Sequence, residues 1–284
     1  MSIELVGAVD MHVHFGPDPG RTRRVSGPEA VTQAAAAGHA GLVLKSHDAP
    51  TANVAAALSE SASVHVFGSI CCDVGVGGLN SVAVDNALAI GAKVVWLPTF
   101  SSTQDWERHG RQHHVAWPGV AVCDEAGELL PAARAVLKST FDADAIVATG
   151  HISIAEHIAV LRARPRTGKV IVTHALETLC GPGNEMTVEF LEELVTLGAV
   201  VEFCALTCIG ALATRDPADI AAAITRLGAQ NCTIASDFGQ EKNEPPVIGL
   251  ARFAEALHAC GLSTAQIRTM AVENPQRLLG VAPC

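Results

Sequence analysis

The chain has 284 residues, of which 49% are hydrophobic and 17% charged, and its formal net charge is −10. This length fits one large domain or two small ones, and the composition provides ample material for a buried core. The negative charge argues against binding of nucleic acid or an acidic membrane, because both need clustered lysine and arginine. The first residues do not show the basic region and apolar run of a signal peptide, and the sequence contains no run of 18 apolar residues. It therefore predicts a cytoplasmic protein.

Eight short apolar or β-branched runs alternate with alanine-rich helical patterns along the chain. The runs cover residues 7–15, 41–47, 64–72, 92–99, 145–151, 169–175, 199–205 and 232–238. Such near-continuous apolar runs are typical of parallel strands buried on both faces. Most strand ends recur at about 30 residues, the length of a βαβ unit, which predicts a single α/β domain, a (β/α)8 TIM barrel, over residues 1–284. A doubly wound sheet is the alternative, but the first strand lacks its glycine-rich fingerprint.

The interval between the fourth and fifth predicted strands is longer than one repeat. The insertion, at about 100–130, is polar and aromatic, and a hairpin is expected around residues 124–127. It also contains His109, His113 and His114. Because it follows the carboxyl end of a strand, it is expected over the mouth of the barrel, either as a lid or as a surface decoration.

Side chains that can bind metal interrupt the apolar runs at their carboxyl ends. These are His12, His14, Lys45, His47, His151, His174 and Asp237. In a barrel these ends converge on the catalytic face, and a divalent metal makes such a buried polar group favourable. Alternation along a strand predicts that Asp10 shares one face with the first two histidines. None of the nine cysteines stands in a CxxC pair, so we expect nitrogen and oxygen ligands, which suit Zn²⁺, with Mn²⁺, Fe²⁺ or Co²⁺ as alternatives.

With these residues in this order, the sequence resembles the amidohydrolase superfamily. The matching segments are "HVH" (His12 and His14), "TGH" (His151), "VTH" (His174) and "ASD" (Asp237). The tail "VENPQRLLG" is similar to a segment common in that superfamily, and "FGPDPGRTRR" and "LKSHDAPTA" are similar to an uncharacterised related subgroup. The resemblance implies a distorted barrel that holds one or two divalent metal ions.

The same resemblance implies hydrolysis of an amide, cyclic amide or lactone carbonyl in a small molecule by water that the metal activates. Asp237 would then transfer the proton, and His174 or a second metal would polarise the carbonyl oxygen. The barrel would also support phosphoester hydrolysis, deamination or decarboxylation. A catalytically silent barrel with a structural metal is a further alternative.

The sequence departs from the commonest two-metal pattern of the superfamily. There a carboxylated lysine of the fourth strand bridges the metals, whereas here Trp96 lies at the end of that strand. Our hypothesis places the bridging role on Lys45, at the end of the second strand. The alternatives are a single metal with Lys45 as a substrate contact, or His47 as an additional ligand.

Four residues are candidates for contact with the small-molecule substrate: His47, Arg21, Arg23 and Trp96. The two arginines could clamp a carboxylate or phosphate, or they could belong to a solvated loop before the first helix. The alanine-rich outer helices are compatible with a homo-oligomer.

Overall fold

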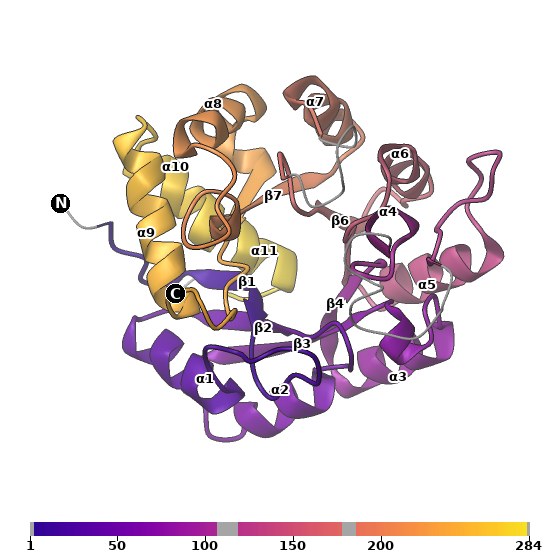
Figure 1. Cartoon of the computed structure of the whole chain (residues 1–284), viewed down its shortest axis with the longest axis horizontal. Coiled ribbons are helices and arrows are strands. Elements are labelled where there is room, and N and C mark those ends of the chain that lie inside the picture. Colours follow the sequence, from indigo (N-terminus) through magenta and orange to yellow (C-terminus); the bar gives the residue numbers. More distant parts are fainter. Residues whose placement is uncertain (1–2, 107–118, 178–185, 283–284) are drawn as a thin grey trace.

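A computed structural model describes residues 3–106, 119–177 and 186–282 of the chain. Its eight parallel strands form one sheet in sequence order, with helices around them (Figure 1). The strands are β1 (Val9–His14), β2 (Gly41–Lys45), β3 (His65–Cys71), β4 (Ala92–Trp96), β5 (Ile146–Ala148), β6 (Lys169–Val172), β7 (Val200–Cys204) and β8 (Cys232–Ala235). The α-helices are α1 (Gly27–Ala36), α2 (Ala52–Ser59), α3 (Ser81–Ile90), α4 (Thr103–Trp106), α5 (Pro131–Asp142), α6 (Ile154–Arg162), α7 (Val188–Thr196), α8 (Pro217–Leu227), α9 (Pro246–Ala259), α10 (Thr264–Arg268) and α11 (Asn274–Leu279). The predicted (β/α)8 barrel is confirmed.

Local sequence signals account for where several helices begin. Ser26, Ser153 and Ser263 each accept a hydrogen bond from the third helical residue, whose Glu or Gln side chain bonds back to the serine. This capping box satisfies backbone N–H groups that have no partner within the helix. α1, α6 and α10 therefore start at positions that the sequence itself marks.

The barrel closes through the segment that follows β8. The backbone N–H of His14 donates to the carbonyl of Phe238 at 2.9 Å, and that of Asp237 donates to the carbonyl of His12 at 2.9 Å. The chain after β8 therefore continues beside the end of β1. This closure brings Asp237 next to the two histidines of the first strand.

A β-bulge in β1 changes which side chains face the barrel interior. Asp10 pairs with Leu42 and Val13 pairs with Leu44, so two residues of β1 lie opposite one residue of β2. The extra residue reverses the alternation of side chains. Asp10 consequently lines a small cavity against α1 together with Val13. The prediction that Asp10 shares a face with His12 and His14 is wrong.

The displaced Asp10 carboxylate has a structural role. Its Oδ1 accepts hydrogen bonds from the backbone N–H of His12 at 3.2 Å and of Ser236 at 3.0 Å. Burial raises the pKa of Asp10 to about 6. Asp10 thus links β1 to the residue that follows β8, just below the face formed by the carboxyl ends of the strands.

Apolar side chains fill the interior of the barrel below that face. Met11, Val43, Val94 and Ile171 belong to this cluster, and Trp96 closes it at the end of β4 with 1% of its surface exposed. A TIM barrel packed in this way is a solid core rather than a pore. The polar residues at the strand ends therefore rest on an apolar floor.

The described part of the insertion contains the expected turn. Cys123 pairs antiparallel with Leu129, and the backbone N–H of Gly127 donates to the carbonyl of Asp124 at 3.0 Å. The hairpin around residues 124–127 is therefore confirmed. The three histidines expected here, His109, His113 and His114, lie outside the described residues.

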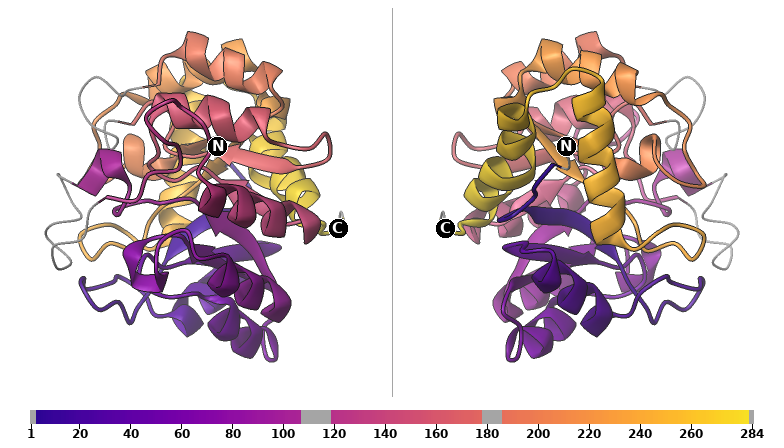
Figure 2. Two further views of the ribbon diagram at one scale, coloured as in Figure 1. Left: turned by 90° about the vertical axis from the view of Figure 1, so that its right-hand side faces the viewer. Right: turned by 90° about the vertical axis from the view of Figure 1, so that its left-hand side faces the viewer.

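The loops that follow β1 and β8 extend to the same side of the barrel (Figure 2). The backbone N–H of Arg24 donates to the carbonyl of Gly239 at 2.7 Å, and Arg23 forms an antiparallel bridge with Gln240. These contacts fix the two loops to each other. Within the described ranges, no helix has the length and apolar character needed to cross a membrane.

Candidate metal centre

Three side chains converge at the carboxyl ends of β1 and β8. His12 Nε2 and His14 Nε2 each lie 3.0 Å from Asp237 Oδ1, and all three side chains are buried. Zinc ligands lie about 2.0–2.2 Å from the ion, so two ligand atoms on one ion are on the order of 3 Å apart. The three groups are therefore spaced as ligands of a single cation.

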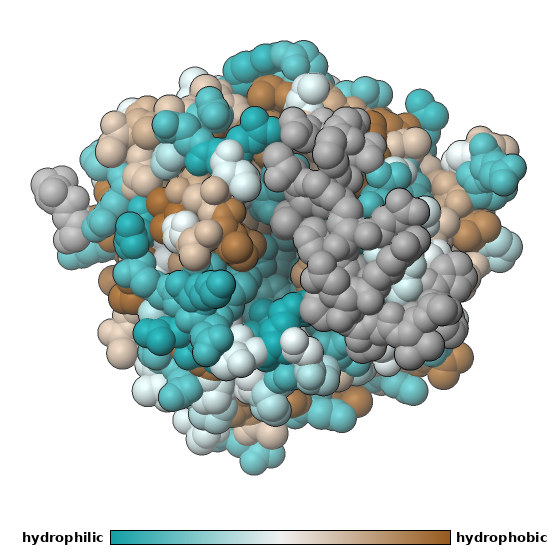
Figure 3. Space-filling model, viewed as in Figure 1, coloured by the Kyte–Doolittle hydropathy of each residue, from teal (hydrophilic) through white to brown (hydrophobic). Residues whose placement is uncertain are grey.

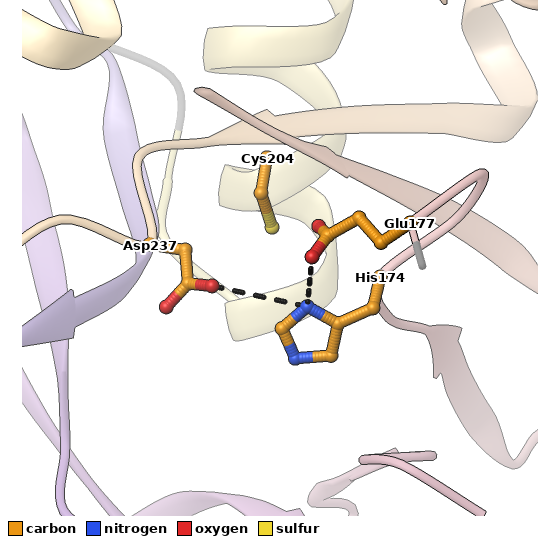
Figure 4. Close-up of side chains that lie close together, drawn as sticks. All are labelled: His174, Glu177, Cys204 and Asp237. Atoms are coloured by element: carbon orange, nitrogen blue, oxygen red, sulfur yellow. Dashed lines mark hydrogen bonds and ion pairs between the residues drawn. The ribbon is translucent and has the colours of Figure 1, made fainter. Parts of the chain in front are cut away.

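The other oxygen of Asp237 faces a second group of donor atoms (Figure 4). His174 Nδ1 lies 3.8 Å from Asp237 Oδ2 and 3.1 Å from Glu177 Oε2, and the Cys204 thiol belongs to the same group within 4.8 Å. The ring of His151 is centred 4.5 Å from that of His174. Asp237 thus stands between the two histidines of β1 and the residues that follow β5, β6 and β7.

Four histidines of this region share one arrangement: Nδ1 faces a buried carboxylate. The pairs are His12 with Glu202 at 3.0 Å, His47 with Asp73 at 3.4 Å, His151 with Asp105 at 2.6 Å and His174 with Glu177 at 3.1 Å. A carboxylate accepts the Nδ1 proton, which leaves the lone pair of the neutral ring on Nε2. Carboxylate–histidine pairs of this kind orient histidine ligands at metal sites.

Two residues of the centre have a backbone conformation that is rare without glycine. The φ angles of His174 and Asp237 are 58° and 51°, both in the left-handed region. Such strain persists only where the surroundings enforce it, and it concentrates at functional sites. Each residue is the second after the end of a short strand, so the turn points its side chain inward at the strand end.

The chemistry of the donors fits a divalent cation. His174 Nε2 is buried and has no hydrogen-bond partner among the described residues. Burial, followed by the proximity of His174, lowers the pKa of His151 to about 4, so its ring is neutral at pH 7 and able to bind metal. A cation would compensate buried polar atoms that are costly to leave without a partner.

Asp237 keeps its negative charge despite its burial. Burial alone would raise its pKa, but the charge of His12 and hydrogen bonds to His12 and His14 hold the pKa well below its usual range. An ionised carboxylate between two imidazoles is both a ligand and a proton acceptor. Its position at the centre agrees with the prediction, and its roles as ligand and proton acceptor remain predictions.

Lys45 lies inside the same cluster. Its Nζ is 2.8 Å from His12 Nε2 and 4.3 Å from the centre of the Trp96 ring, and the side chain is 1% exposed. The Trp96 ring also packs on His12, with ring centres 4.5 Å apart. Trp96 therefore supports His12 and Lys45 from below and does not line the pocket, a position that suits holding these residues rather than touching a substrate.

A pocket of about 220 Å³ opens above the centre. His14, Lys45, His151, His174 and Asp237 line its metal side. Arg21, Arg23, His47, Phe100, Leu206, Leu212 and Gln240 line the remainder. Figure 3 shows a hollow near the middle of the molecule in this view, with hydrophilic residues along its lower edge.

Hydrogen bonds hold His47, which follows β2, to residues that follow β3 and β4. Its Nδ1 lies 2.7 Å from the Thr99 hydroxyl, which in turn bonds to the Asp73 carboxylate. The ring stacks on His14 with centres 4.9 Å apart. The predicted position of His47 at the pocket agrees with the structure, and its role remains a prediction.

Sequence analysis missed several residues that support the centre: Asp73, Asp105, Glu177, Glu202 and Cys204. Glu202 carried a usable signal, because a charged residue inside the apolar run "AVVEFCA" needs a buried partner. Asp73 and Glu177 lie in loops, Asp105 lies in the short helix α4, and Cys204 looks like an ordinary strand residue. The expectation of nitrogen and oxygen donors alone also overlooked the thiol of Cys204, which lies 3.5 Å from Glu202.

Comparison with protein families gives one match. Residues 7–202 match a family described as "Family of unknown function (DUF6282)". The chain belongs to this family. The matching region includes β1 to β6 and most of β7, and hence the candidate ligands except Cys204 and Asp237. A comparison with curated proteins finds no match.

Solved structures similar to this DUF6282 member share its whole length. They include a putative 2-pyrone-4,6-dicarboxylic acid hydrolase from Pseudomonas putida (15% identity, TM-score 0.64, covering 98% of this chain and 99% of that one). An amidohydrolase from Pseudomonas aeruginosa (12%, TM-score 0.61, 98% and 95%) and a 2,6-dihydroxybenzoate decarboxylase from Rhizobium (10%, TM-score 0.62, 97% and 99%) are also similar. At these identities the likeness shows the fold, and at that level the predicted resemblance to amidohydrolases is confirmed.

Proposed function

We propose that this DUF6282 member is a metal-dependent hydrolase that cleaves an amide, cyclic amide or lactone of a small molecule. The observation that carries the proposal is the convergence of His12, His14 and Asp237 on one position with spacings of 3.0 Å. His151 and His174 line the same pocket. The likeness in fold to an amidohydrolase and to a putative hydrolase supports the assignment.

A divalent cation held by these residues would polarise the substrate carbonyl and lower the pKa of a water molecule. The protein positions the groups around it. Glu202 and Glu177 hold His12 and His174 through Nδ1 at 3.0 and 3.1 Å. The imidazoles therefore keep their orientation as the substrate enters.

Proton transfer is assigned to Asp237. Its Oδ1 is engaged by His12 and His14, whereas Oδ2 lies 3.8 Å from His174 and faces the second group of donors. We assign Oδ2 as the atom that takes a proton from the attacking water and returns it to the leaving nitrogen or oxygen. We assign to His174, which lies beside Oδ2 and lines the pocket, the role of assisting at the carbonyl oxygen.

The pocket limits the size of the substrate. Its volume of about 220 Å³ lies below the range of about 300–1,000 Å³ that is usual for drug-sized ligands. Leu206 and Leu212 add an apolar wall opposite the polar groups. We therefore propose a compact organic substrate. Zn²⁺ as the native metal and Lys45 as a bridging group belong to the same proposal.

Metal analysis of the purified protein tests the first part. We expect near-stoichiometric divalent metal in the unmodified chain and its loss in the variant that combines His12→Ala with His14→Ala. His258→Ala is a matched control, because this histidine lies in the last turn of α9, bonds to the carbonyl of Leu262 and belongs to none of the groups of donor atoms at the centre. Full metal content in the double variant would overturn the assignment.

A panel of small amides, cyclic amides and lactones tests the reaction with the metal-loaded protein. Asp237→Asn should lower kcat by at least about 10²-fold, because a general base is removed. Phosphoesters, aminated heterocycles and hydroxybenzoates belong in the same panel. Turnover of only one of these classes would replace hydrolysis of amides and lactones with phosphoester hydrolysis, deamination or decarboxylation.

A further inference from the structure

The loop between β1 and α1 is organised by one carboxylate. Asp18 Oδ1 accepts from the backbone N–H groups of Gly20 at 2.9 Å and Arg21 at 3.0 Å. Asp18 Oδ2 accepts from Arg23 Nε at 2.7 Å and Nη2 at 2.5 Å, and the side chains of this pair are each 3% exposed. The Asp18–Arg23 pair is therefore buried within a loop whose other residues are largely exposed, Arg24 among them.

Arg21 and Arg23 of this loop differ in their electrostatic state. Arg23 is neutralised by a two-point ion pair with Asp18. Arg21 forms no ion pair with any residue in the described ranges, and it lies half-buried over the ring of Phe100, 4.3 Å from the ring centre. A guanidinium remains charged under these conditions, so Arg21 has positive charge available for a ligand.

Arg21 faces the same pocket as the metal centre. Phe100 connects the two regions, since its ring is centred 4.1 Å from that of His47 and 5.5 Å from that of His151. Arg21 and the candidate ligands His14 and His174 line one cavity. A small molecule in this cavity therefore reaches both the guanidinium and the metal side.

We propose that Arg21 forms a carboxylate-binding subsite, so that the substrate is a small, planar carboxylic acid. The proposal rests on the proposed function only for the location of the bond that is cleaved, at the metal side. A planar guanidinium can donate two parallel hydrogen bonds to the two oxygens of a carboxylate. The aromatic walls of Phe100 and His47 suit a flat carbon skeleton.

The charges around the pocket favour a single negative charge on the ligand. Asp237 lines the pocket, and Asp18, Asp48 and Asp73 lie within electrostatic range of Arg21. Lys45 also lines the pocket, but its Nζ lies against His12 and Trp96 on the metal side. A phosphate carries nearly two charges at pH 7, and only one of them would be balanced by Arg21. A monoanionic carboxylate meets one unpaired guanidinium, and the rest of the molecule can approach the metal side without further repulsion.

Benzoate, benzamide and phenylphosphonate are suitable probes for calorimetric titration of the Co²⁺-loaded protein. Benzoate should bind, and benzamide, which has the same shape without the charge, should bind at least about tenfold more weakly, as loss of a charge-assisted hydrogen bond predicts. Arg21→Gln should weaken benzoate binding by a similar factor. Arg24→Gln, in the same loop and exposed, is the matched control and should leave the affinity unchanged.

The cobalt absorption spectrum distinguishes the subsite from direct binding to the metal. A carboxylate held by Arg21 leaves the spectrum unchanged, whereas a carboxylate that becomes a metal ligand alters it. An altered spectrum with affinity independent of Arg21 would overturn the proposal. Tighter binding of phenylphosphonate than of benzoate, with loss in Arg21→Gln, would overturn the choice of a carboxylate.

Arg21→Lys retains the charge without the planar fork, so an intermediate affinity would support the geometry and guard against misfolding of the glutamine variant.

Two further results keep this test separate from that of the proposed function. Benzoate binding through Arg21 without turnover of any amide or lactone would remove the hydrolase and leave the subsite. Turnover that is independent of Arg21 would remove the subsite and leave the hydrolase.

Discussion

His12 Nδ1 lies 3.0 Å from Glu202 Oε1, and both side chains are fully buried although 190 residues separate them in the chain. This pair joins β1 to β7 across the barrel interior. Because Glu202 holds Nδ1, His12 Nε2 points toward Asp237, as a histidine that binds metal beside Asp237 requires. β7, in which the sequence predicted no ligand, thus fixes the orientation of the His12 ring.

Glu202→Gln should weaken divalent metal binding by about 10–100-fold, because the histidine loses the charged partner that fixes its ring and its basicity. Affinity is measured by competition with a chelator of known strength. Glu241→Gln, in the exposed loop after β8, should bind metal like the unmodified chain. Equal affinities in the two variants would show that Glu202 has no role in orienting His12.

Lys45→Met should reduce the amount of metal bound. Lys45 Nζ lies 2.8 Å from His12 Nε2, so this side chain can contribute directly to a metal that His12 holds. The buried methionine preserves most of the volume against Trp96 and removes the amine. Atomic absorption measures the stoichiometry, and unchanged content would favour a substrate contact. Increased content would instead show that the amine competes with the metal for His12.

Gly239→Ala should destabilise the protein and weaken metal binding. The added Cβ would overlap the carbonyl oxygen of His14, and the φ of Gly239 is 132°, a conformation that side chains rarely adopt. Gly127→Ala is the matched control, since Gly127 also has a positive φ, of 80°, but has open space around its Cβ. Thermal unfolding should show a clearly larger loss of stability for Gly239→Ala, whereas equal losses would mean that β1 and β8 can move apart at no cost.

The free energy of unfolding should fall as the pH decreases from about 6.5 to about 4, in part through His157. Burial lowers the pKa of His157 from 6.5 to about 4, and its ring bonds to the Ser153 carbonyl at 2.8 Å and the Thr149 hydroxyl at 3.1 Å. Below pH 6.5 the unfolded chain therefore binds a proton that the folded chain excludes, and stability present above that pH is lost.

Urea unfolding at a series of pH values measures this dependence. The contribution approaches about 1.4 kcal/mol per pH unit within this window. His157→Gln removes the titrating group, so the variant should lose less stability than the unmodified chain over the same interval. Identical slopes for the two proteins would show that the folded state accommodates a charged His157.

Local patterns in the sequence were sufficient to predict the strands and most of the candidate ligands. Apolar runs of strand length need burial on both faces, and a polar residue at the end of such a run is conspicuous because burial without a partner is costly. His12, His14, His151, His174 and Asp237 were identified in this way. Their grouping followed from the rule that parallel strands of a barrel end on one face.

The position of Asp10 was predicted incorrectly because strict alternation ignores a bulge. The extra residue in β1 depends on the register with β2, which no pattern within β1 reveals. Sequence analysis also treated Arg21 and Arg23 as equivalent. Only the folded loop pairs Arg23 with Asp18 and leaves Arg21 over Phe100.

The sequence by itself determined the barrel and most of the residues available for a metal, because hydrophobic periodicity and residue type are local properties of the chain. Only the tertiary structure decided how these residues are held: which carboxylate faces each Nδ1, that Cys204 lies beside His174, and which arginine remains available. Such contacts join residues from different strands and loops, and their distances depend on barrel closure, strand register and loop path.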